Sequence, residues 1–529
     1  MKDMDRLVEI LAQKIRKQVH IRIIGDYDVD GVTSSHLFLT ALRRVGAKVD
    51  VVIPHRIQDG YGLSLHLLQQ AKEDGVDTIL TCDNGIAAID EIAWAKAQKM
   101  TVLVTDHHAV PFEEHEGRRT EKKSLADAVV NPHQQDCGYP YKELCGAGVA
   151  WNVIRVLYEN YDMDKREAED LLDFVAMATV CDVMSLTGEN RILVKEGLKR
   201  IRHTKNIGLQ ALMQACNVQP ENISAYHFGY VLGPCVNATG RLDTARHALR
   251  LFETGQETEA EEIARDLVDL NQERKELTLQ GVEMAKKLCE EGGYENDPIL
   301  VLFLPDVHES IAGLIAGRIR EMYNRPVFVL TRGEEGVKGS GRSTENYSMY
   351  ENMCGCAELF TKFGGHPMAA GLSLPEENVE KFRRKINENC PLTVEEVCPD
   401  IHIDMAMPVG YASTELVHQF ALLEPFGKDN PSPLFADRNL SISRMWLIGK
   451  NRNVLRMSVL SEYGQPVPVI FFGDVETLFA YFTEKFGQEE VENALHGRKN
   501  RILFSMVYTA KVDFYQGNEN LQLEMKYYR

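Results

Sequence analysis

The chain has 529 residues, which is too long for one small domain and enough for roughly three to four separate hydrophobic cores. Hydrophobic residues make up 44% and charged residues 26% of it, a balance that excludes a disordered or fibrous protein. The net charge of −19 opposes broad attraction to polyanions, but it leaves room for a local basic groove, and carboxylates can hold metal ions.

Neither a membrane span nor a signal peptide is predicted. No stretch approaches the roughly 18 uninterrupted apolar residues of a membrane span, and apolar residues from Leu7 to Ile15 recur at helical spacing instead. Eleven cysteines are scattered without a CxxC pair, and Cys354 and Cys356 have no second pair to complete a zinc site. We therefore expect a cytoplasmic protein with reduced, packed thiols and no membrane contact.

Short β-branched runs alternate with helix-length segments from Val19 to Asn131. Strands are predicted at residues 21–24, 49–53, 78–81, 101–104 and 128–130, with helices such as 34–44 and 87–99 between them. A series of this kind forms a parallel sheet with helices on its faces. Further helices are predicted at residues 149–158, 168–180 and 191–201.

Three further regions follow along the chain. Apolar residues at helical spacing among charged ones predict a long connecting helix from about Thr244 to Glu291. A second α/β unit runs from Pro298 to about Asn389, with strands at 299–303 and 327–330 and a helix at 311–322. After Cys398, apolar and polar residues alternate, which predicts a small β-barrel of the oligonucleotide-binding kind. The predicted fold is α/β with a C-terminal β-barrel, divided into residues 1–243, 244–294, 295–392 and 393–529.

Acidic residues follow several strands of the predicted parallel sheet, whose carboxyl ends meet at one edge. Each acid alone could be a turn former or a helix N-cap. Carboxylates gathered at one edge, however, repel one another unless divalent cations neutralise them. Oxygen ligands with one or two imidazoles suit Mn²⁺ or Mg²⁺. The residues concerned are Asp26, Asp28, Asp30, Asp83, Asp106, His107, His108 and Asp182.

Phosphoester hydrolysis is the chemistry that this pattern predicts. Two metal ions about 4 Å apart are the arrangement that activates water against a phosphorus centre. The spacing of the first three acids imitates an EF-hand calcium loop, but Leu37 stands where that loop needs Glu, and the segment follows a strand. The phosphate-binding loop of nucleotide-driven motors is absent from the sequence.

These motifs resemble those of the DHH phosphoesterase family, for which the triplet Asp106-His107-His108 is characteristic. The resemblance implies a DHH domain and a DHH-associated domain joined by a long helix, with the active site facing the cleft between them, and then an oligonucleotide-binding barrel. It also implies 5′-to-3′ degradation of single-stranded DNA to mononucleotides in DNA repair and recombination. Further matching motifs lie at residues 54–62, 144–149, 233–241, 308–313, 339–343, 364–371 and 423–427.

The resemblance also implies a role for each matching residue. Asp26 and Asp106 would orient ligands or imidazoles, and His108 would contact the scissile phosphate or give it a proton. Asp83 would be suited to bridging the two Mn²⁺ or Mg²⁺ ions, and Ile24 replaces a histidine found in many family members, so one ion would have more water ligands. The implied metal ligands are Asp28, Asp30, Asp83, His107 and Asp182, and the implied substrate contacts are Arg56, Arg241, Ser340, Arg342 and His366.

Two other functions stay open at this point. A DHH hydrolase of short oligonucleotides, cyclic dinucleotides or bisphosphorylated nucleotides would share the acidic motifs, although such proteins are usually shorter and need no barrel. A catalytically silent scaffold in a replication or repair assembly is the third possibility, and the intact set of acids and histidines argues against it. The resemblance further implies a monomer whose partners are single-stranded DNA, a RecQ-type helicase and a single-strand-binding protein.

Overall fold

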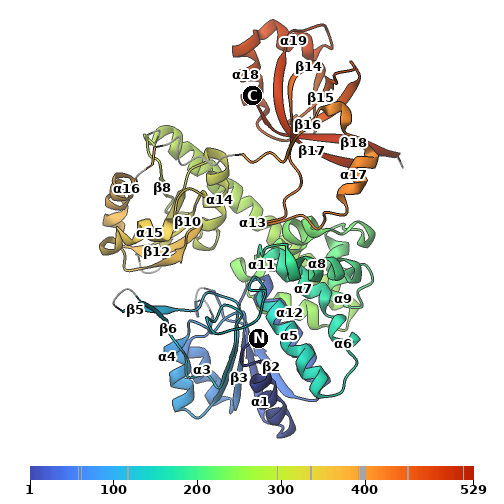
Figure 1. Ribbon diagram of the computed structural model, residues 1–529. Helices are drawn as coiled ribbons and strands as arrows, with labels where there is room; N and C mark the ends of the chain where they lie inside the picture. Colours follow the sequence, from blue (N-terminus) through green and yellow to red (C-terminus); the bar gives the residue numbers. More distant parts are fainter. Residues whose placement is uncertain are drawn as a thin grey trace. The chain divides into compact units, whose positions relative to one another are not determined.

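The computed structural model describes the chain except residues 57–58, 61, 116–117, 295, 334–335, 391, 394–400, 450–451 and 516–517 (Figure 1). The chain divides into two compact units, Met1–Asp400 and Ile401–Arg529. The expected start of the β-rich region at Cys398 therefore falls outside the described residues. No helix in the described ranges is long and apolar enough to cross a membrane.

A five-stranded parallel sheet opens the N-terminal unit, with the strand order β2-β1-β3-β4-β7. Its strands are β1 (His20–Ile24), β2 (Lys48–Val52), β3 (Thr78–Cys82), β4 (Thr101–Thr105) and β7 (Ala128–Val130). Each lies within one residue of a predicted strand, so the prediction of a βαβ series is confirmed. A hairpin of β5 (Phe112–His115) and β6 (Arg118–Glu121) was not predicted.

Helices cover both faces of this sheet, because alternate strand residues point to opposite sides (Figure 1). Ile23 shares one hydrophobic core with Leu7 of α1 (Met4–Arg16) and Phe38 of α2 (Val29–Arg44). Ile24 shares the other core with Leu68 of α3 (Leu65–Glu73), which also contains residues of α4 (Ile89–Ala97). The carboxyl edge between the two helical layers stays open for polar side chains.

A helical layer follows the sheet, and α5 (Gly146–Asn160) packs against its first core. The other helices are α6 (Arg166–Glu169), α7 (Leu172–Cys181), α8 (Gly188–Ile201), α9 (Ile207–Ala215), α10 (Ala225–His227), α11 (Gly233–Leu242), α12 (Ala245–Glu253) and α13 (Glu257–Glu291). The single helix predicted from Thr244 to Glu291 is wrong, because α12 and α13 are separate. The backbone is extended at Thr254, whose hydroxyl accepts a hydrogen bond from the Gln256 amide.

The second sheet of this unit is mixed, with the order β11-β12-β10-β9-β8. Its strands are β8 (Leu300–Phe303), β9 (Val327–Gly333), β10 (Gly336–Arg342), β11 (Lys362–His366) and β12 (Ala369–Leu374). Residues of α13 and α14 (Ala312–Tyr323) share a core with one face, and those of α15 (Met349–Cys354) and α16 (Val379–Glu388) with the other. Gly281 lets α13 and α14 pack closely, because a Cβ there would lie 2.3 Å from Ile315 Cδ1.

The C-terminal unit contains a closed five-stranded barrel, which confirms the predicted β-barrel. Its strands are β14 (Phe435–Ile448), β15 (Val454–Leu460), β16 (Pro466–Phe471), β17 (Leu503–Tyr515) and β18 (Asn518–Tyr528). The barrel closes because β14 pairs with both β15 and β17. Leu455, Met457 and Val459 fill its core while Arg456 between them is exposed. The remaining elements are β13 (Met405–Ala406), α17 (Thr414–Phe420), α18 (Val475–Phe486) and α19 (Gln488–Leu495).

Candidate metal centre

The acids and histidines predicted for the metal centre converge at the carboxyl edge of the parallel sheet. Three sets of their ligand atoms lie within 4.8 Å of one another. The sets are Asp83, His107 and His108; Asp30, His107 and Asp182; and Asp26, Asp28 and Asp83. Because Asp83 and His107 each belong to two sets, the three sets form one continuous acidic cluster.

The loop after β1 folds tightly, so that Asp26 is buried and Asp28 is half-buried. Asp28 is the N-cap of α2, and its Oδ1 accepts a hydrogen bond from the Gly31 amide at 3.0 Å. A side chain at Gly31 would not fit, because its Cβ would lie 2.4 Å from the Asp26 carbonyl oxygen. Asp26 is 2% exposed, and no hydrogen bond reaches its Oδ1. Burial raises the pKa of Asp26 and of Asp28, and the charges of neighbouring carboxylates add to both shifts.

Asp30 is held by the N-terminus of α5. Its Oδ2 accepts a hydrogen bond from the Gly146 amide at 2.6 Å, and its Oδ1 accepts one from the Ala147 amide at 2.8 Å. The first amides of a helix have no partner within the helix and carry partial positive charge, so they suit a buried carboxylate. A Cβ at Gly146 would lie 2.7 Å from Asp83 Cβ. The hydrogen bonds from the N-terminus of α5 to Asp30 were not predicted, although the Gly-Ala-Gly run beside a predicted helix could have indicated them.

Asp83 occupies a backbone conformation that residues other than glycine rarely adopt. Its φ of 61° lies in the left-handed region, directly after β3. Burial raises the pKa of Asp83 well above its usual range, and the charges of Asp30 and Asp28 raise it further. The fold therefore places this carboxyl group where it is costly to ionise without a cation.

His107 presents one ring nitrogen to three carboxylates. Its Nε2 lies 3.1 Å from Asp83 Oδ1, 3.6 Å from Asp182 Oδ2 and 3.7 Å from Asp30 Oδ2, and this nitrogen has no hydrogen-bond partner among the residues that the structure describes. Burial lowers the pKa of His107, which favours the neutral imidazole. A neutral nitrogen lone pair aimed at carboxylates is unfavourable on its own and becomes favourable when all of them share a cation.

Asp106 organises the DHH triplet instead of joining a ligand set. Its Oδ1 accepts hydrogen bonds from the His107 and His108 amides and contacts His108 Nδ1 at 2.7 Å, and its Oδ2 accepts one from the Ile86 amide. Burial works against a charged His108, but the hydrogen bond to Asp106 and the charge of that group raise the pKa of His108 to about 9. This raised pKa favours the protonated form of His108, which belongs to one ligand set with Asp83 and His107.

The donor set fits divalent cations that prefer oxygen. Asp26 Oδ1 and His107 Nε2 are buried polar atoms without hydrogen-bond partners, and three carboxyl groups have raised pKa values. The three ligand sets found in the described part of the chain contain carboxylates and imidazoles but no thiol. Carboxylate-rich sites with few imidazoles favour Mn²⁺ or Mg²⁺ over Zn²⁺.

Three arginines form a cationic cluster in the same unit. Burial lowers the pKa of Arg241 to about 10, and the charges of Arg56 and Arg342 contribute to that shift. Burial and the charge of Arg56 likewise lower the pKa of Arg342. No ion pair joins these three side chains to an acid within the described residues; Arg241 donates to the Ser310 carbonyl and Arg56 stacks on Tyr27. Uncompensated guanidinium groups of this kind suit a bound phosphate.

Four of the five predicted substrate contacts lie around this cluster. A cavity of about 400 Å³ is lined by Tyr27, Arg56 and Ser340, among others. A Cβ at Gly313 would lie 2.9 Å from Arg342 Nη2 and 3.5 Å from Ser340 Cβ, which places these two side chains together. His366 ends β11 opposite Ala369 and is exposed, and it is not among the residues that line the cavity.

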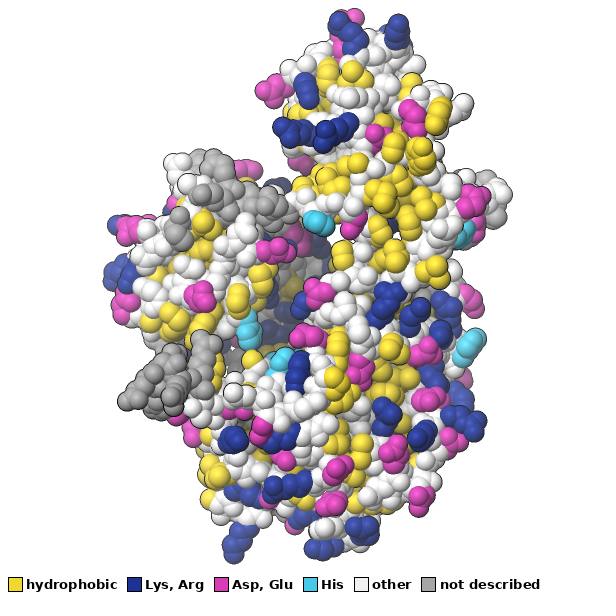
Figure 2. Space-filling view, in the orientation of Figure 1, with side chains coloured by type: hydrophobic (Ala, Val, Ile, Leu, Met, Phe, Trp, Pro, Cys, Tyr) yellow, Lys and Arg dark blue, Asp and Glu magenta, His cyan; other side chains and the backbone are white. Residues whose placement is uncertain are grey.

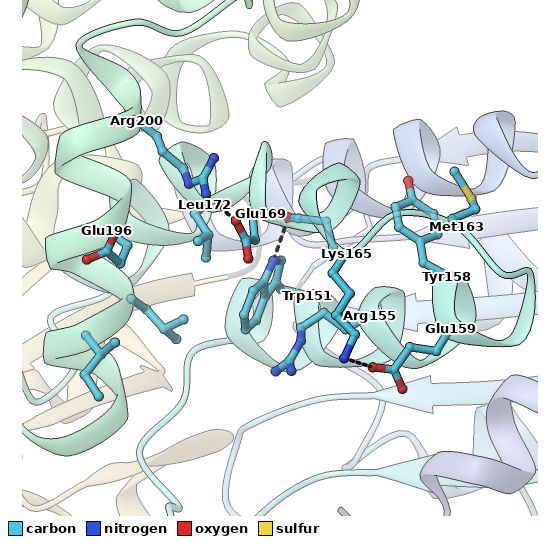
Figure 3. Close-up of a pocket in the computed structure, with 13 residues that line it drawn as sticks. Trp151, Arg155, Tyr158, Glu159, Met163, Lys165, Glu169, Leu172, Glu196 and Arg200 are labelled. Carbon is cyan, nitrogen blue, oxygen red and sulfur yellow. Dashed lines mark hydrogen bonds and ion pairs between the residues drawn. The ribbon is translucent and has the colours of Figure 1, made fainter.

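Another cavity, of about 280 Å³, lies among α5 to α8 and has a different character (Figure 3). Its wall contains Trp151, which donates a hydrogen bond to the Ala168 carbonyl and carries the Arg155 guanidinium over its ring. None of the predicted site residues lines it.

On the face shown in Figure 2, acidic and basic side chains are interspersed, so attraction of this face to a polyanion depends on local clusters of positive charge.

Family models match three parts of the chain. The N-terminal domain of the DHH family matches residues 20–179, the DHHA1 domain matches residues 296–390, and the RecJ OB domain matches residues 403–527. Among solved structures, RecJ from Thermus thermophilus in complex with Mn²⁺ is similar with a TM-score of 0.81 and 26% identity, over 100% of this chain and 72% of that one.

Curated relatives cover most of the chain. The single-stranded-DNA-specific exonuclease RecJ of Haemophilus influenzae is 32% identical over 99% of this chain and 90% of its own length, and that of Escherichia coli is 32% identical over 98% and 89%. RecJ of Bacillus subtilis is 34% identical, and the chain spans 58% of its length. The chain therefore belongs to the RecJ family of single-stranded-DNA-specific exonucleases.

Proposed function

We propose that this protein is a metal-dependent exonuclease that removes mononucleotides from the 5′ end of single-stranded DNA. The observation that carries the proposal is the continuous acidic cluster of carboxylates and His107, in the same unit as three arginines that have no acidic partner among the described residues. Relatives named as single-stranded-DNA-specific exonucleases support the substrate. The 5′ direction and the mononucleotide product rest on the family resemblance.

Five residues would hold two Mn²⁺ or Mg²⁺ ions: Asp28, Asp30, Asp83, His107 and Asp182. RecJ of Thermus thermophilus has been crystallised with each metal. When bound, the two ions supply an activated water and stabilise charge on the phosphate. With Ile24, the last residue of β1, in place of a histidine, water would complete the ligand shell on that side.

The remaining site residues would position the substrate and move a proton. Asp106 fixes the ring of His108 through the 2.7 Å contact, so that a protonated His108 can contact the scissile phosphate or donate a proton to the leaving oxygen. Arg56, Arg241 and Arg342 would hold phosphates near the 5′ end, with Ser340 beside them and His366 at the margin of the site. Asp26 would orient the ligands of the loop after β1.

Monomeric state, a RecQ-type helicase and a single-strand-binding protein as partners, and a cytoplasmic location remain predictions from the resemblance. The barrel and its match to the RecJ OB domain favour long single strands over dinucleotides as substrates. A hydrolase of small substrates and a silent scaffold are therefore the weaker alternatives.

Removing either a candidate metal ligand or the acid that positions His108 should abolish the nuclease activity. Asp83→Ala deletes the carboxylate shared by two ligand sets, and Asp106→Ala frees His108, so we expect activity on single-stranded DNA with Mn²⁺ to fall by about 100-fold or more. The measurement is digestion of 5′-labelled and 3′-labelled oligonucleotides, with circular dichroism to confirm folding. Asp269→Ala, on an exposed position of α13, is the matched control and should retain full activity. Retained activity in Asp83→Ala would overturn the assignment.

A methyl group at the N-terminus of α5 should weaken metal binding. In Gly146→Ala the new Cβ would press on Asp83 Cβ and disturb the two amides that hold Asp30, so we expect Mn²⁺ affinity to drop by about 10-fold to 100-fold. Calorimetric titration with Mn²⁺ measures this. Gly148→Ala is the control on the same helix, since the three atoms nearest to its Cβ would belong to the Leu144 side chain, at 3.3 Å or more. Equal affinities in the two variants would contradict the role of Gly146.

Metal binding should strengthen as the pH rises. The raised pKa values of Asp26, Asp28 and Asp83 mean that the metal-free folded protein retains protons that bound ions must displace, while His107 is already neutral. The gain in Tm at a fixed Mn²⁺ concentration should therefore be larger at about pH 8 than at about pH 6. In Asp83→Asn the gain in Tm on adding Mn²⁺ should be small and should depend little on pH. A wild-type gain that does not change with pH would count against proton displacement.

The barrel offers one surface suited to stacking on bases. Trp446 on β14 is opposite Arg456 on β15, and the guanidinium groups of Arg444 and Arg456 lie 5.7 and 6.0 Å from its ring. These arginines have no ion pair among the residues described in the barrel. An aromatic ring flanked by uncompensated cations matches the combination of base stacking and phosphate attraction that holds single strands.

Truncating this aromatic residue should weaken binding of long substrates. We expect Trp446→Ala to raise the Kd for a long oligothymidylate by about 10-fold, because one stacked base contributes about 1–3 kcal/mol. Cleavage of a trinucleotide at saturation should be unchanged. Tyr463→Ala, beyond the other end of β15, is the control and should leave both quantities near wild type. Fluorescence anisotropy gives the Kd, and an unchanged value for Trp446→Ala would remove this surface from the DNA path.

A further inference from the structure

Two cysteines far from the acidic cluster in sequence lie within contact of each other. Cys216, directly after α9, and Cys235, in the first turn of α11, have sulfur atoms 3.8 Å apart. A disulfide has a sulfur separation of about 2.05 Å, so a closure of less than about 2 Å would join them. No other cysteine pair in the described ranges is in hydrogen-bond contact.

The surroundings of Cys235 favour its reactive form. The hydrogen bond with Cys216 lowers the pKa of Cys235 and burial opposes this, but the Asn271 amide, which donates to the sulfur at 3.4 Å, and the positive charges of Lys275 and Arg274 lower the pKa further. Arg274 in turn donates to Asn271 Oδ1 and so fixes the amide. A thiolate is the nucleophile in thiol oxidation, and these contacts stabilise it.

We propose that Cys216 and Cys235 form a thiol-oxidation site, at which a hydroperoxide converts the two thiols into a reversible disulfide. The Cys235 thiolate attacks one oxygen of the peroxide and breaks the O–O bond, which gives a sulfenic acid and hydroxide. The Cys216 sulfur then attacks the Cys235 sulfur, the S–O bond breaks, and the thiol proton leaves with the hydroxyl group as water. Overall, two thiols and one hydrogen peroxide give one disulfide and two waters. Cys235 is 2% exposed whereas Cys216 is partly exposed, so the oxidant would reach the Cys235 sulfur from the side of Cys216.

The disulfide would act on the candidate site through α11. Asn237, two residues after Cys235, accepts a hydrogen bond from the Val29 amide at 3.1 Å, between Asp28 and Asp30. Gly240 packs against Tyr27, where a Cβ would lie 2.4 Å from the Tyr27 carbonyl oxygen, and Arg241 belongs to the arginine cluster. A pull on Cys235 toward α9 therefore shifts the helix that supports the loop after β1. This effect on activity rests on the proposed nuclease function, whereas the disulfide itself does not.

Peptide mapping of the full chain tests the site directly. The reduced protein is treated with a few equivalents of hydrogen peroxide, digested without reductant and analysed by mass spectrometry. We expect one linked pair of peptides, containing Cys216 and Cys235, that disappears after dithiothreitol. Cys354→Ser, which removes an exposed thiol, should still form the link, and Cys216→Ser and Cys235→Ser should not. Oxidation of Cys235 without the link, or links between other cysteines only, would overturn the proposal.

Nuclease assays on the same samples test the effect on α11. Oxidised wild-type protein should cleave single-stranded DNA about tenfold more slowly than the reduced protein, because small displacements of a site are costly, and dithiothreitol should restore the rate. Cys216→Ser should show neither change. A complete disulfide with an unchanged rate would overturn the coupling. Reduced protein without any nuclease activity would instead refute the proposed function, and the mapping result would still decide the disulfide.

Discussion

The repulsion between buried carboxylates at one edge of the parallel sheet is the constraint on which the rest of the site depends. Removal from water raises the pKa of Asp26, Asp28 and Asp83, and the charges of neighbouring carboxylates raise it further; in the metal-free protein this lowers the free energy of unfolding as the pH rises above the ordinary pKa of an aspartate. The fold compensates part of this cost with the amides of two helix N-termini, one at Asp28 and one at Asp30. Two divalent cations would neutralise the negative charge that these amides do not compensate.

A second cluster of like charges stands in the same unit, and it explains how a chain of net charge −19 can act on a polyanion. Arg241 and Arg342 are half-buried, and this burial, together with repulsion from Arg56, lowers the pKa of both. Each cluster is unfavourable alone, since one has excess negative and the other excess positive charge. A phosphodiester strand bound with divalent cations would supply both missing charges at once, so that specificity would come from local charge and not from the overall field.

The sequence was sufficient for the features that depend on local pattern. β-branched runs located the parallel strands to within a residue, and the acids after them were placed together because parallel strands share a carboxyl edge. The sequence was not sufficient where a local side-chain contact or a segment distant in the chain determines the structure. The break between α12 and α13 depends on the extended backbone at Thr254, and the partner of Asp30 comes from α5, more than 100 residues away. The β5–β6 hairpin has a polar, charged sequence with no apolar alternation to reveal it.

An aspartate after a strand can both cap a helix or turn and bind a metal ion. Its hydrogen bonds show how much of the carboxylate each role uses. A carboxylate has about four lone-pair sites. Asp106 uses them on three backbone amides and on His108, which leaves little capacity for a cation and favours a role in orienting the triplet. Asp30 accepts two amide bonds and Asp28 accepts one as an N-cap, while Oδ1 of Asp26 accepts none. A carboxylate that caps a helix therefore still has lone pairs with which to bind metal. The number of lone pairs left after the backbone amides are satisfied separates candidate ligands from positioning residues better than the position after a strand does.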